Sequence, residues 1–302
     1  MGALGVLVIV GVAVAVAAVL RAASWRSAEQ SVRNRLGPLS VGGMVPGAEA
    51  IRLEGADPLA VLALHGFGDT PQSLAYVASA CHRRGWTVHV PLLPGHGRSL
   101  ASFAASTGED WERGAREALR LLLERHQHVA IVGQSMGAAL ASLIAADEPR
   151  IASCTWLAPL LSTSPRMERG SRIWWLVALV QPVLPSDDSR SIHNPVESAR
   201  ARSPGVLPVQ LVPRLVRLVH RAIEALPRVT APTLVMQSRE DNRLTGAGTE
   251  AAVARLGSDV RELRWVTGAG HVLSVDYGRE ALCEQIADWV GAHPVAPAVP
   301  AM

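Results

Sequence analysis

The chain has 302 residues, of which 49% are apolar and 18% are charged, and its formal net charge is +3. This balance is typical of a globular protein with a large core and excludes an intrinsically disordered chain. Every basic residue is an arginine, and the arginines are scattered rather than interleaved with aromatic residues, so no nucleic-acid partner is predicted. The cysteines lack metal-ligand spacing and lie in apolar stretches, where we expect small buried side chains: Cys81, Cys154 and Cys283.

An apolar N-terminal segment, residues 1–21, opens the chain, and residues 2–20 carry no charged or strongly polar side chain. As a helix this run rises about 28 Å, close to the hydrocarbon thickness of a bilayer. We therefore expect residues 2–20 to contact a membrane as an anchor. Arginines follow the run at once, and the positive-inside rule then predicts a cytoplasmic catalytic domain. The alternative is an exported protein whose signal peptide is cleaved near residues 22–24.

Residues 22–50 are interpreted as a linker, because they are rich first in Arg and Ser and then in Gly and Pro. In residues 51–293 short apolar runs alternate with longer helical patterns, which predicts an α/β fold with a doubly wound, mostly parallel sheet. The tail, residues 294–302, is rich in Pro and Ala and is expected to be frayed. The predicted strands are 59–64, 86–90, 128–132, 151–157, 233–237 and 260–266, and the predicted helices are 72–84, 109–125, 136–146, 245–256 and 278–290.

A long insertion, about residues 162–229, interrupts this alternation with many prolines and two helical patterns, 171–180 and 209–226. Because it has no strand pattern and lies between two strands of a parallel sheet, it predicts a mainly helical cap over the edge where ligands bind. Trp174 and Trp175 in this cap are candidates to line an acyl-binding groove or to dock on lipid. Ordinary packing of a cap helix on the core is the competing interpretation.

The segment Gly133-Gln134-Ser135-Met136-Gly137 has the pattern G-x-S-x-G, directly after an apolar strand and directly before an Ala/Leu-rich helix. A nucleophile elbow needs this context, because the strand turns sharply into the helix and the backbone is crowded around the serine. Ser135 would lie at a helix N-terminus, where backbone N–H groups favour developing negative charge. The sequence therefore predicts Ser135 as a nucleophile.

A serine hydroxyl needs a base, and the base needs an orienting acid. His271 is the predicted base, because it lies in a Gly-rich loop between the last strand and the last helix, at the carboxyl edge of the sheet. Asp241 is the predicted acid, since it follows the penultimate strand and can reach that loop. Glu240 is the adjacent competitor and Asp276 the remote one.

Two N–H donors must also face the oxygen of a tetrahedral intermediate. We expect the backbone N–H of Met136, the residue after the nucleophile, to be one of them. The second is expected from the loop after the strand at 59–64, at the backbone N–H of Phe67 in His65-Gly66-Phe67-Gly68. Neither a metal cluster nor a phosphate-binding loop is apparent, so no cofactor and no metal are predicted.

Five ordered motifs, HGFGDTP (65–71), PLLPGHGRS (91–99), GQSMGAA (133–139), PTLVMQSREDN (232–242) and GAGHVLSVD (268–276), resemble the bacterial carboxylesterase and monoacylglycerol lipase branch of the α/β-hydrolases. The resemblance spans about residues 55–290 and implies the α/β-hydrolase fold, a small cap and esterase activity on acyl esters or monoglycerides. One departure is Ala138, where the family often has a further glycine. An apolar anchor and an aromatic, aliphatic cap favour a hydrophobic acyl ester as substrate.

The resulting hypothesis is a two-step acyl transfer in which Ser135 forms an acyl-enzyme that water then hydrolyses. Thioesterase, acyltransferase and cofactor-free haloperoxidase activities of the same fold remain open. A protein of a different class, a catalytically idle membrane-tethered binding module, is the further alternative.

Overall fold

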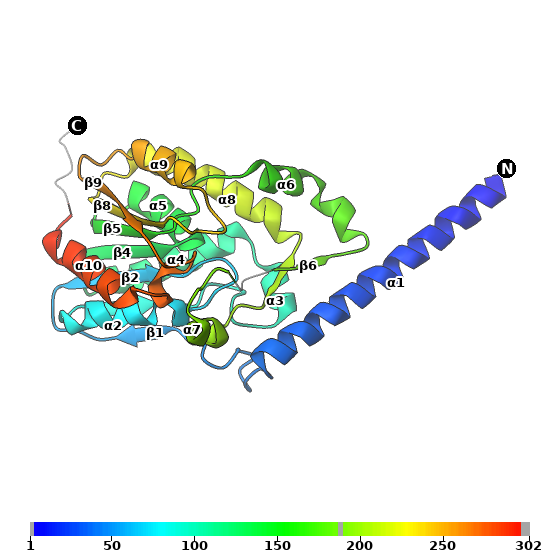
Figure 1. Cartoon of the computed structure of the whole chain (residues 1–302), viewed down its shortest axis with the longest axis horizontal. Helices are drawn as coiled ribbons and strands as arrows, with labels where there is room; N and C mark the ends of the chain where they lie inside the picture. The colour runs from blue at the N-terminus through cyan, green and yellow to red at the C-terminus, as the bar shows by residue number, and fades with distance from the viewer. Residues whose placement is uncertain (1–2, 187–189, 297–302) are drawn as a thin grey trace.

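The central element of the protein is a seven-stranded sheet, seen in a computed structural model that describes residues 3–186 and 190–296 (Figure 1). Its strand order is β1-β3-β2-β4-β5-β8-β9, and all neighbouring strands are parallel except β1 and β3. The predicted doubly wound, mostly parallel sheet is thus confirmed. The strands are β1 (Ile51–Leu53), β2 (Leu59–Leu64), β3 (Thr87–Val90), β4 (His128–Gln134), β5 (Ile151–Leu157), β8 (Thr233–Ser238) and β9 (Arg261–Val266).

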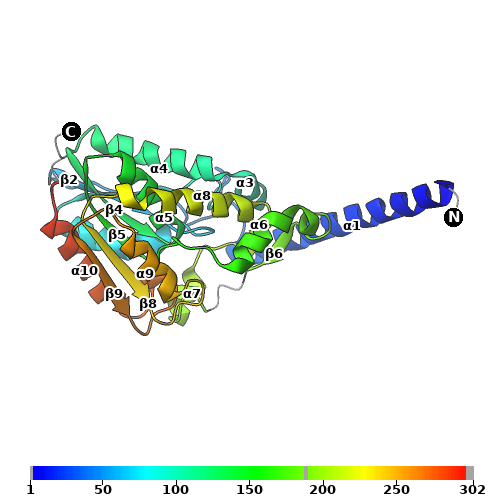
Figure 2. The ribbon, with the colours of Figure 1, turned by 90° about the horizontal axis from the view of Figure 1, so that it is seen from above.

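Helices cover both faces of the sheet (Figures 1 and 2), which is why every residue of β2, β5 and β8 is buried. Two of them form one apolar layer with the sheet, and four form the other. Strands buried on both sides need the continuous apolar runs that the sequence shows. The first layer contains α2 (Ala75–Arg83) and α10 (Arg279–Ala292), and the second contains α4 (Gly108–Leu123), α5 (Met136–Asp147), α8 (Leu211–Ala225) and α9 (Gly246–Ala254).

The strand order reverses at β2, because the chain leaves β2 for β3 on one side and later returns to form β4 on the other. Leu64, the last residue of β2, is paired with Gly133, the last residue but one of β4. The loops that follow these strands therefore emerge side by side at the carboxyl edge. In open α/β sheets this crevice is where ligands bind.

The insertion is mainly helical, with α6 (Pro165–Ala178), α7 (Pro195–Arg200) and α8, but it also holds a small antiparallel sheet of β6 (Val183–Pro185) and β7 (Val206–Pro208). The sequence pattern did not predict these strands, because three residues that end in proline are too short to show a strand period. The apolar side of α8 belongs to the main core and packs on α5, so the second half of the insertion completes a layer of the sheet.

The N-terminal helix α1 (Ala3–Leu36) is much longer than expected (Figure 1). A linker was expected at residues 22–50, yet the helix continues to Leu36. Within the expected linker, only residues 37–50 lack helix or strand. The continuation is explained by good helix formers and by apolar residues at helical spacing that pack on the domain. Residues 4–36 contain a window of mean hydropathy 2.6 with no buried residue, so α1 is long and apolar enough to cross a membrane. Residues 1–2 of the apolar segment and 297–302 of the predicted tail lie outside the described residues.

Candidate active site

Ser135 lies at the turn from β4 into α5, with φ 53° and ψ −114°. A positive φ at a residue with a side chain costs free energy and persists only where the surroundings enforce it. Here its N–H donates to the carbonyl of Leu157 (2.9 Å), and its own carbonyl accepts from Ala138 (3.0 Å) and Leu160 (3.1 Å). The strained backbone leaves the serine side chain partly exposed at the carboxyl edge of the sheet.

The two glycines of the motif are required by space. A Cβ on Gly137 would lie 2.0 Å from the carbonyl oxygen of Leu64, at the end of β2. A Cβ on Gly133 would lie 2.6 Å from the backbone nitrogen of Ala138. Ala138, the departure from the family pattern, is itself fully buried without such a conflict, since its methyl group belongs to the core cluster.

The structure brings the three predicted triad residues together. The Oγ–H of Ser135 donates to Nε2 of His271 over 3.0 Å, and Nδ1 of His271 lies 2.9 Å from Oδ2 of Asp241. A carboxylate only accepts, so Nδ1 carries the proton and Nε2 is left as an acceptor for the serine. The side chains of His271 and Asp241 are only 11% and 1% exposed, so the hydrogen bond between them is shielded from water.

Asp241 is held as an ionised carboxylate. Its Oδ1 accepts from the backbone N–H groups of Arg243 (2.7 Å) and Leu244 (3.0 Å), and its Oδ2 also accepts from the amide of Gln237 (2.9 Å). Burial of the carboxyl raises its pKa, but the hydrogen bonds from His271 and from these backbone groups outweigh that effect and leave the pKa below its ordinary value. An ionised acid at this position favours a positive charge on the imidazole.

The two competing acids lie elsewhere. Glu240 is exposed and accepts a hydrogen bond from the N–H of Gly268 at the start of the histidine loop (2.6 Å). Asp276 is fully buried, but its oxygens bond to backbone N–H groups rather than to the imidazole.

Asp276 joins the cap to the loop that carries His271, a function that its sequence position did not suggest. Its Oδ2 accepts from the N–H groups of Gly270 and His193, both at 2.7 Å, and its Oδ1 accepts from those of Asn194 and Tyr277, both at 2.8 Å. Gly270 directly precedes His271, so this carboxylate positions the imidazole and the base of the cap at once.

We expect Asp276→Asn to lower kcat by about 10- to 100-fold, because an amide NH₂ would face N–H groups that now donate to an oxygen and would displace the His271 loop. Steady-state kinetics on a soluble ester measures kcat, and thermal unfolding reports the accompanying loss of stability. Exposed Asp259, changed to Asn, is the control. A variant of Asp276 with the kcat of the native chain would show that the loop does not depend on this carboxylate.

The loop after β2 lies against the serine, since a Cβ on Gly66 would be 3.4 Å from Cβ of Ser135. His65 holds this loop: its Nδ1–H donates to the carbonyl of Gly66 (2.9 Å), and its Nε2 accepts from the N–H of Leu93 (3.1 Å). Burial lowers the pKa of His65 to about 4, so the ring is neutral and both bonds persist at neutral pH. The side chain of Phe67 packs in an aromatic cluster with His96, Phe103 and Trp111, which leaves its main chain at the loop's turn.

The two cap tryptophans lie on α6 in different surroundings. Trp174 is partly buried, whereas Trp175 is 54% exposed. Neither takes part in the hydrogen bonds that join Ser135, His271 and Asp241. Among the described residues no group of three or more His, Cys, Asp or Glu side chains is arranged to hold a metal ion.

A partly exposed hydroxyl, an imidazole nitrogen placed to accept its proton and an ionised acid behind the imidazole are the parts of an activated nucleophile. Met136 is the first residue of α5, so its N–H is one of those that a helix leaves without an intrahelical acceptor. The loop at residues 65–68 lies against the same serine, since a Cβ on Gly66 would also be 3.6 Å from the carbonyl oxygen of Gln134.

Comparison with known proteins agrees with this geometry. A family model described as serine aminopeptidase, S33 (Hydrolase_4) matches residues 57–277. A thermostable monoacylglycerol lipase of Bacillus sp. (strain H-257) is 25% identical over 253 residues, which are 83% of this chain and 97% of that protein. A carboxylesterase of Bacillus subtilis (strain 168) is 21% identical over 76% of this chain and 92% of its own length.

Solved structures show the same fold. One, reported with the metagenome-derived lipolytic enzymes LipS and LipT, has a TM-score of 0.75 and 31% identity, and the match covers 82% of this chain and 99% of that one. The monoacylglycerol lipase of Paleococcus ferrophilus has a TM-score of 0.70 and 18% identity, over 81% of this chain and 98% of its own. The family model begins at residue 57, so α1 lies outside the part that it matches.

Proposed function

The chain belongs to the serine aminopeptidase S33 family of α/β-hydrolases, and on that premise we propose that Ser135 is its nucleophile, His271 its general base and Asp241 the acid that orients the base. It is an ester hydrolase, as the five ordered motifs predicted. The observation that carries the residue assignment is the continuous hydrogen-bonded chain from the Ser135 hydroxyl through His271 to Asp241.

In the proposed mechanism Oγ of Ser135 attacks the ester carbonyl while Nε2 of His271 takes its proton. The backbone N–H groups of Met136 and Phe67 bind the oxyanion, and the imidazolium then gives its proton to the leaving alcohol. Water, deprotonated by the same imidazole, attacks the acyl-enzyme and releases the carboxylic acid. Asp241 stays ionised throughout and stabilises the imidazolium. The steps use side chains and backbone N–H groups of this chain, the ester and one water molecule.

The substrate proposed is a hydrophobic acyl ester, of the monoacylglycerol or simple carboxylic ester type. Relatives named monoacylglycerol lipase and carboxylesterase support this class. Trp174, the partly buried member of the cap pair, is the better candidate for contact with the acyl chain.

We further propose that α1 anchors the protein in a membrane through residues 2–20, with the catalytic domain on the cytoplasmic side. The apolar run of α1 supports the anchor, and the arginines that follow the run support the side. For the domain organisation we propose an α/β-hydrolase domain at residues 51–293 with the cap at about 162–229. Sequencing the N-terminus of the mature protein separates the anchor from a cleaved signal peptide.

A series of p-nitrophenyl esters of increasing acyl length, followed by long-chain monoacylglycerols, tests the proposed function. We expect hydrolysis that rises with acyl length, and acylation of Ser135 by a fluorophosphonate probe. Adding glycerol as an acceptor and analysing the products separates hydrolysis from acyl transfer, while acyl thioesters test the thioesterase alternative. A native chain that neither turns over any ester nor reacts with the probe would be an idle binding module.

A further inference from the structure

The second half of α1 is packed firmly on the hydrolase domain. Trp25, Ala28, Val32 and Leu36 recur every three or four residues, so they share one side of the helix. They pack into two apolar clusters with residues of the cap strands, of α3 (Leu100–Ala105) and of the loop after α1. The partners in these clusters are Leu100, Val183, Val206, Met44, Val45 and Ala48.

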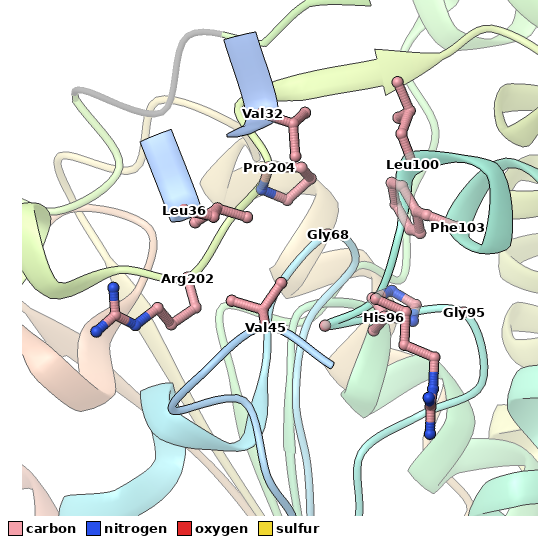
Figure 3. Close-up of a pocket in the computed structure, with 12 residues that line it drawn as sticks. Val32, Leu36, Val45, Gly68, Gly95, His96, Leu100, Phe103, Arg202 and Pro204 are labelled. Atoms are coloured by element: carbon pink, nitrogen blue, oxygen red, sulfur yellow. The ribbon is translucent and has the colours of Figure 1, made fainter. Parts of the chain in front are cut away.

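At its C-terminal end, α1 reaches the loop that follows β2. Val32 and Leu36 face Gly68, the residue after Phe67, across a small pocket (Figure 3). The pocket has a volume of about 20 Å³, which is room for about one water molecule and too little for an acyl chain. This is therefore a tight junction between α1 and the domain rather than a substrate site.

Arg21 ties α1 to the cap where the apolar run of α1 ends. Its guanidinium donates a hydrogen bond to the carbonyl of Ala178, the last residue of α6. Figures 1 and 2 both show this end of α6 beside α1. Because α1 is one unbroken helix from residue 3 to residue 36, its position relative to the cap is fixed along its whole length. The end of α6 therefore lies at the same height along the axis of α1 as Arg21.

The second half of α6 and the residues just after it carry large exposed apolar side chains, which we name the apolar α6 surface. They recur at helical spacings of three and four, whereas the exposed charged residues of α6 all precede Ile173. Clustered exposed apolar side chains on a soluble protein mark a contact with a partner or with a membrane. The apolar α6 surface consists of Ile173, Trp175, Leu176, Leu179 and Val180.

We propose that the apolar α6 surface lies in the membrane interface beside α1, so that the two helices hold the catalytic domain at a fixed orientation on the bilayer. The inference rests on the anchor role proposed above for α1. A span at residues 2–20 places Arg21 at the boundary between hydrocarbon and headgroups. The hydrogen bond between Arg21 and Ala178 then brings the apolar end of α6 to the same depth. Trp175 has the aromatic side chain that favours this zone.

Three further arginines support a membrane as the partner that covers the apolar α6 surface. Arg166, Arg169 and Arg172 are exposed and recur every three residues along the part of α6 before Ile173. Anionic lipid headgroups attract basic residues near the membrane surface, so arginines that precede the apolar α6 surface along the helix suit headgroups above an immersed apolar end. The acyl layer thus covers the apolar end of α6, and a hydrophobic ester reaches the cap from the lipid rather than from water.

The direct test is a depth measurement on the full chain in vesicles of phosphatidylcholine and phosphatidylglycerol. Leu179→Cys carries an environment-sensitive maleimide dye, and part of the lipid carries a spin-label quencher on its acyl chains. Burial raises the pKa of all three native thiols to about 12, so they react poorly and the new cysteine takes the dye. Val260→Cys is the matched control. Val260 is 47% exposed and lies at the amino end of β9, whereas the cap lies over the carboxyl ends of the strands.

We expect quenching at residue 179 to exceed that at residue 260 by about twofold or more, because an interfacial helix places its apolar side roughly 5–10 Å below the headgroups. Equal quenching at the two positions would overturn the proposal. A second result would also overturn it: a dye at residue 179 that is shielded from water only at high protein concentration, with or without lipid. A second copy of the chain, and not the membrane, would then cover the surface. The readout does not depend on catalysis, so an inactive chain would refute the proposed function without affecting this result.

A kinetic experiment tests the same contact between the apolar α6 surface and lipid. Leu179→Glu should leave turnover of a short soluble ester unchanged but lower hydrolysis of a monoacylglycerol embedded in vesicles by about tenfold, because a charge must enter the interface. Val260→Glu should change neither rate. Equal loss on both substrates would mean that Leu179 supports the fold of the cap and not its contact with lipid, and it would count against the proposal.

Discussion

Replacing Ser135 with alanine is expected to lower kcat for a soluble ester by about 10⁶-fold, because the attacking atom itself is removed. His271→Ala should cost nearly as much, since without Nε2 nothing accepts the serine proton over 3.0 Å. The double variant should be little worse than either single variant, as expected for residues that act as a unit. Stopped assays with high enzyme concentration measure the residual rates.

Ser142→Ala provides the matched control for the serine variant. Ser142 lies on the same helix as the elbow, and its buried hydroxyl donates to the carbonyl of Ala138 one turn earlier, away from the imidazole. It should keep most of its activity and should react with a fluorophosphonate, whereas Ser135→Ala should not react. If the effects of Ser135→Ala and His271→Ala simply multiplied in the double variant, the two residues would not share one step and the triad assignment would be wrong.

Those features of the fold that follow from local patterns were predictable. β4 ends at Gln134 and α5 begins at Met136, so the strand–serine–helix context was visible in the residues around Ser135. The chain order of Ser135, Asp241 and His271 was also sufficient, because parallel strands put their carboxyl ends at one edge and loops after neighbouring strands must meet there. β8 and β9, which precede the acid and the histidine, are such neighbours.

Contacts between distant segments were not predictable. Asp276 was weighed only as a triad acid, since nothing at its position indicates that it bonds the backbone of residues 193 and 194 in the cap. The neutral state of His65 follows from burial and from the N–H of Leu93, and both depend on the folded arrangement of two loops. The extension of α1 to Leu36 depends in the same way on a docking surface formed by the cap strands and the loop after α1.

Replacing the orienting acid is expected to cause the second large loss of kcat, and it distinguishes Asp241 from Glu240. Asp241→Asn should lower kcat by about 10⁴-fold, because an amide NH₂ facing Nδ1 makes that nitrogen an acceptor and moves the proton to Nε2. The imidazole could then no longer accept the hydroxyl proton of Ser135, although all atoms would remain close to their native positions. Glu240→Gln should cost less than about tenfold, since it changes only the bond to the N–H of Gly268.

The two acid variants can be compared in one experiment, because tautomer loss and loop disturbance have different signatures. Loss of the correct tautomer should lower kcat far more than it changes KM. Thermal stability should fall only modestly, because the hydrogen bonds of Arg243 and Leu244 to Oδ1 survive in the asparagine variant and the bond from Gln237 to Oδ2 is lost. Loop disturbance in the Glu240 variant should lower stability before it lowers kcat. A larger loss of kcat in Glu240→Gln than in Asp241→Asn would transfer the role of orienting acid to Glu240. The 2.9 Å contact between Asp241 and His271 would then be a structural hydrogen bond alone.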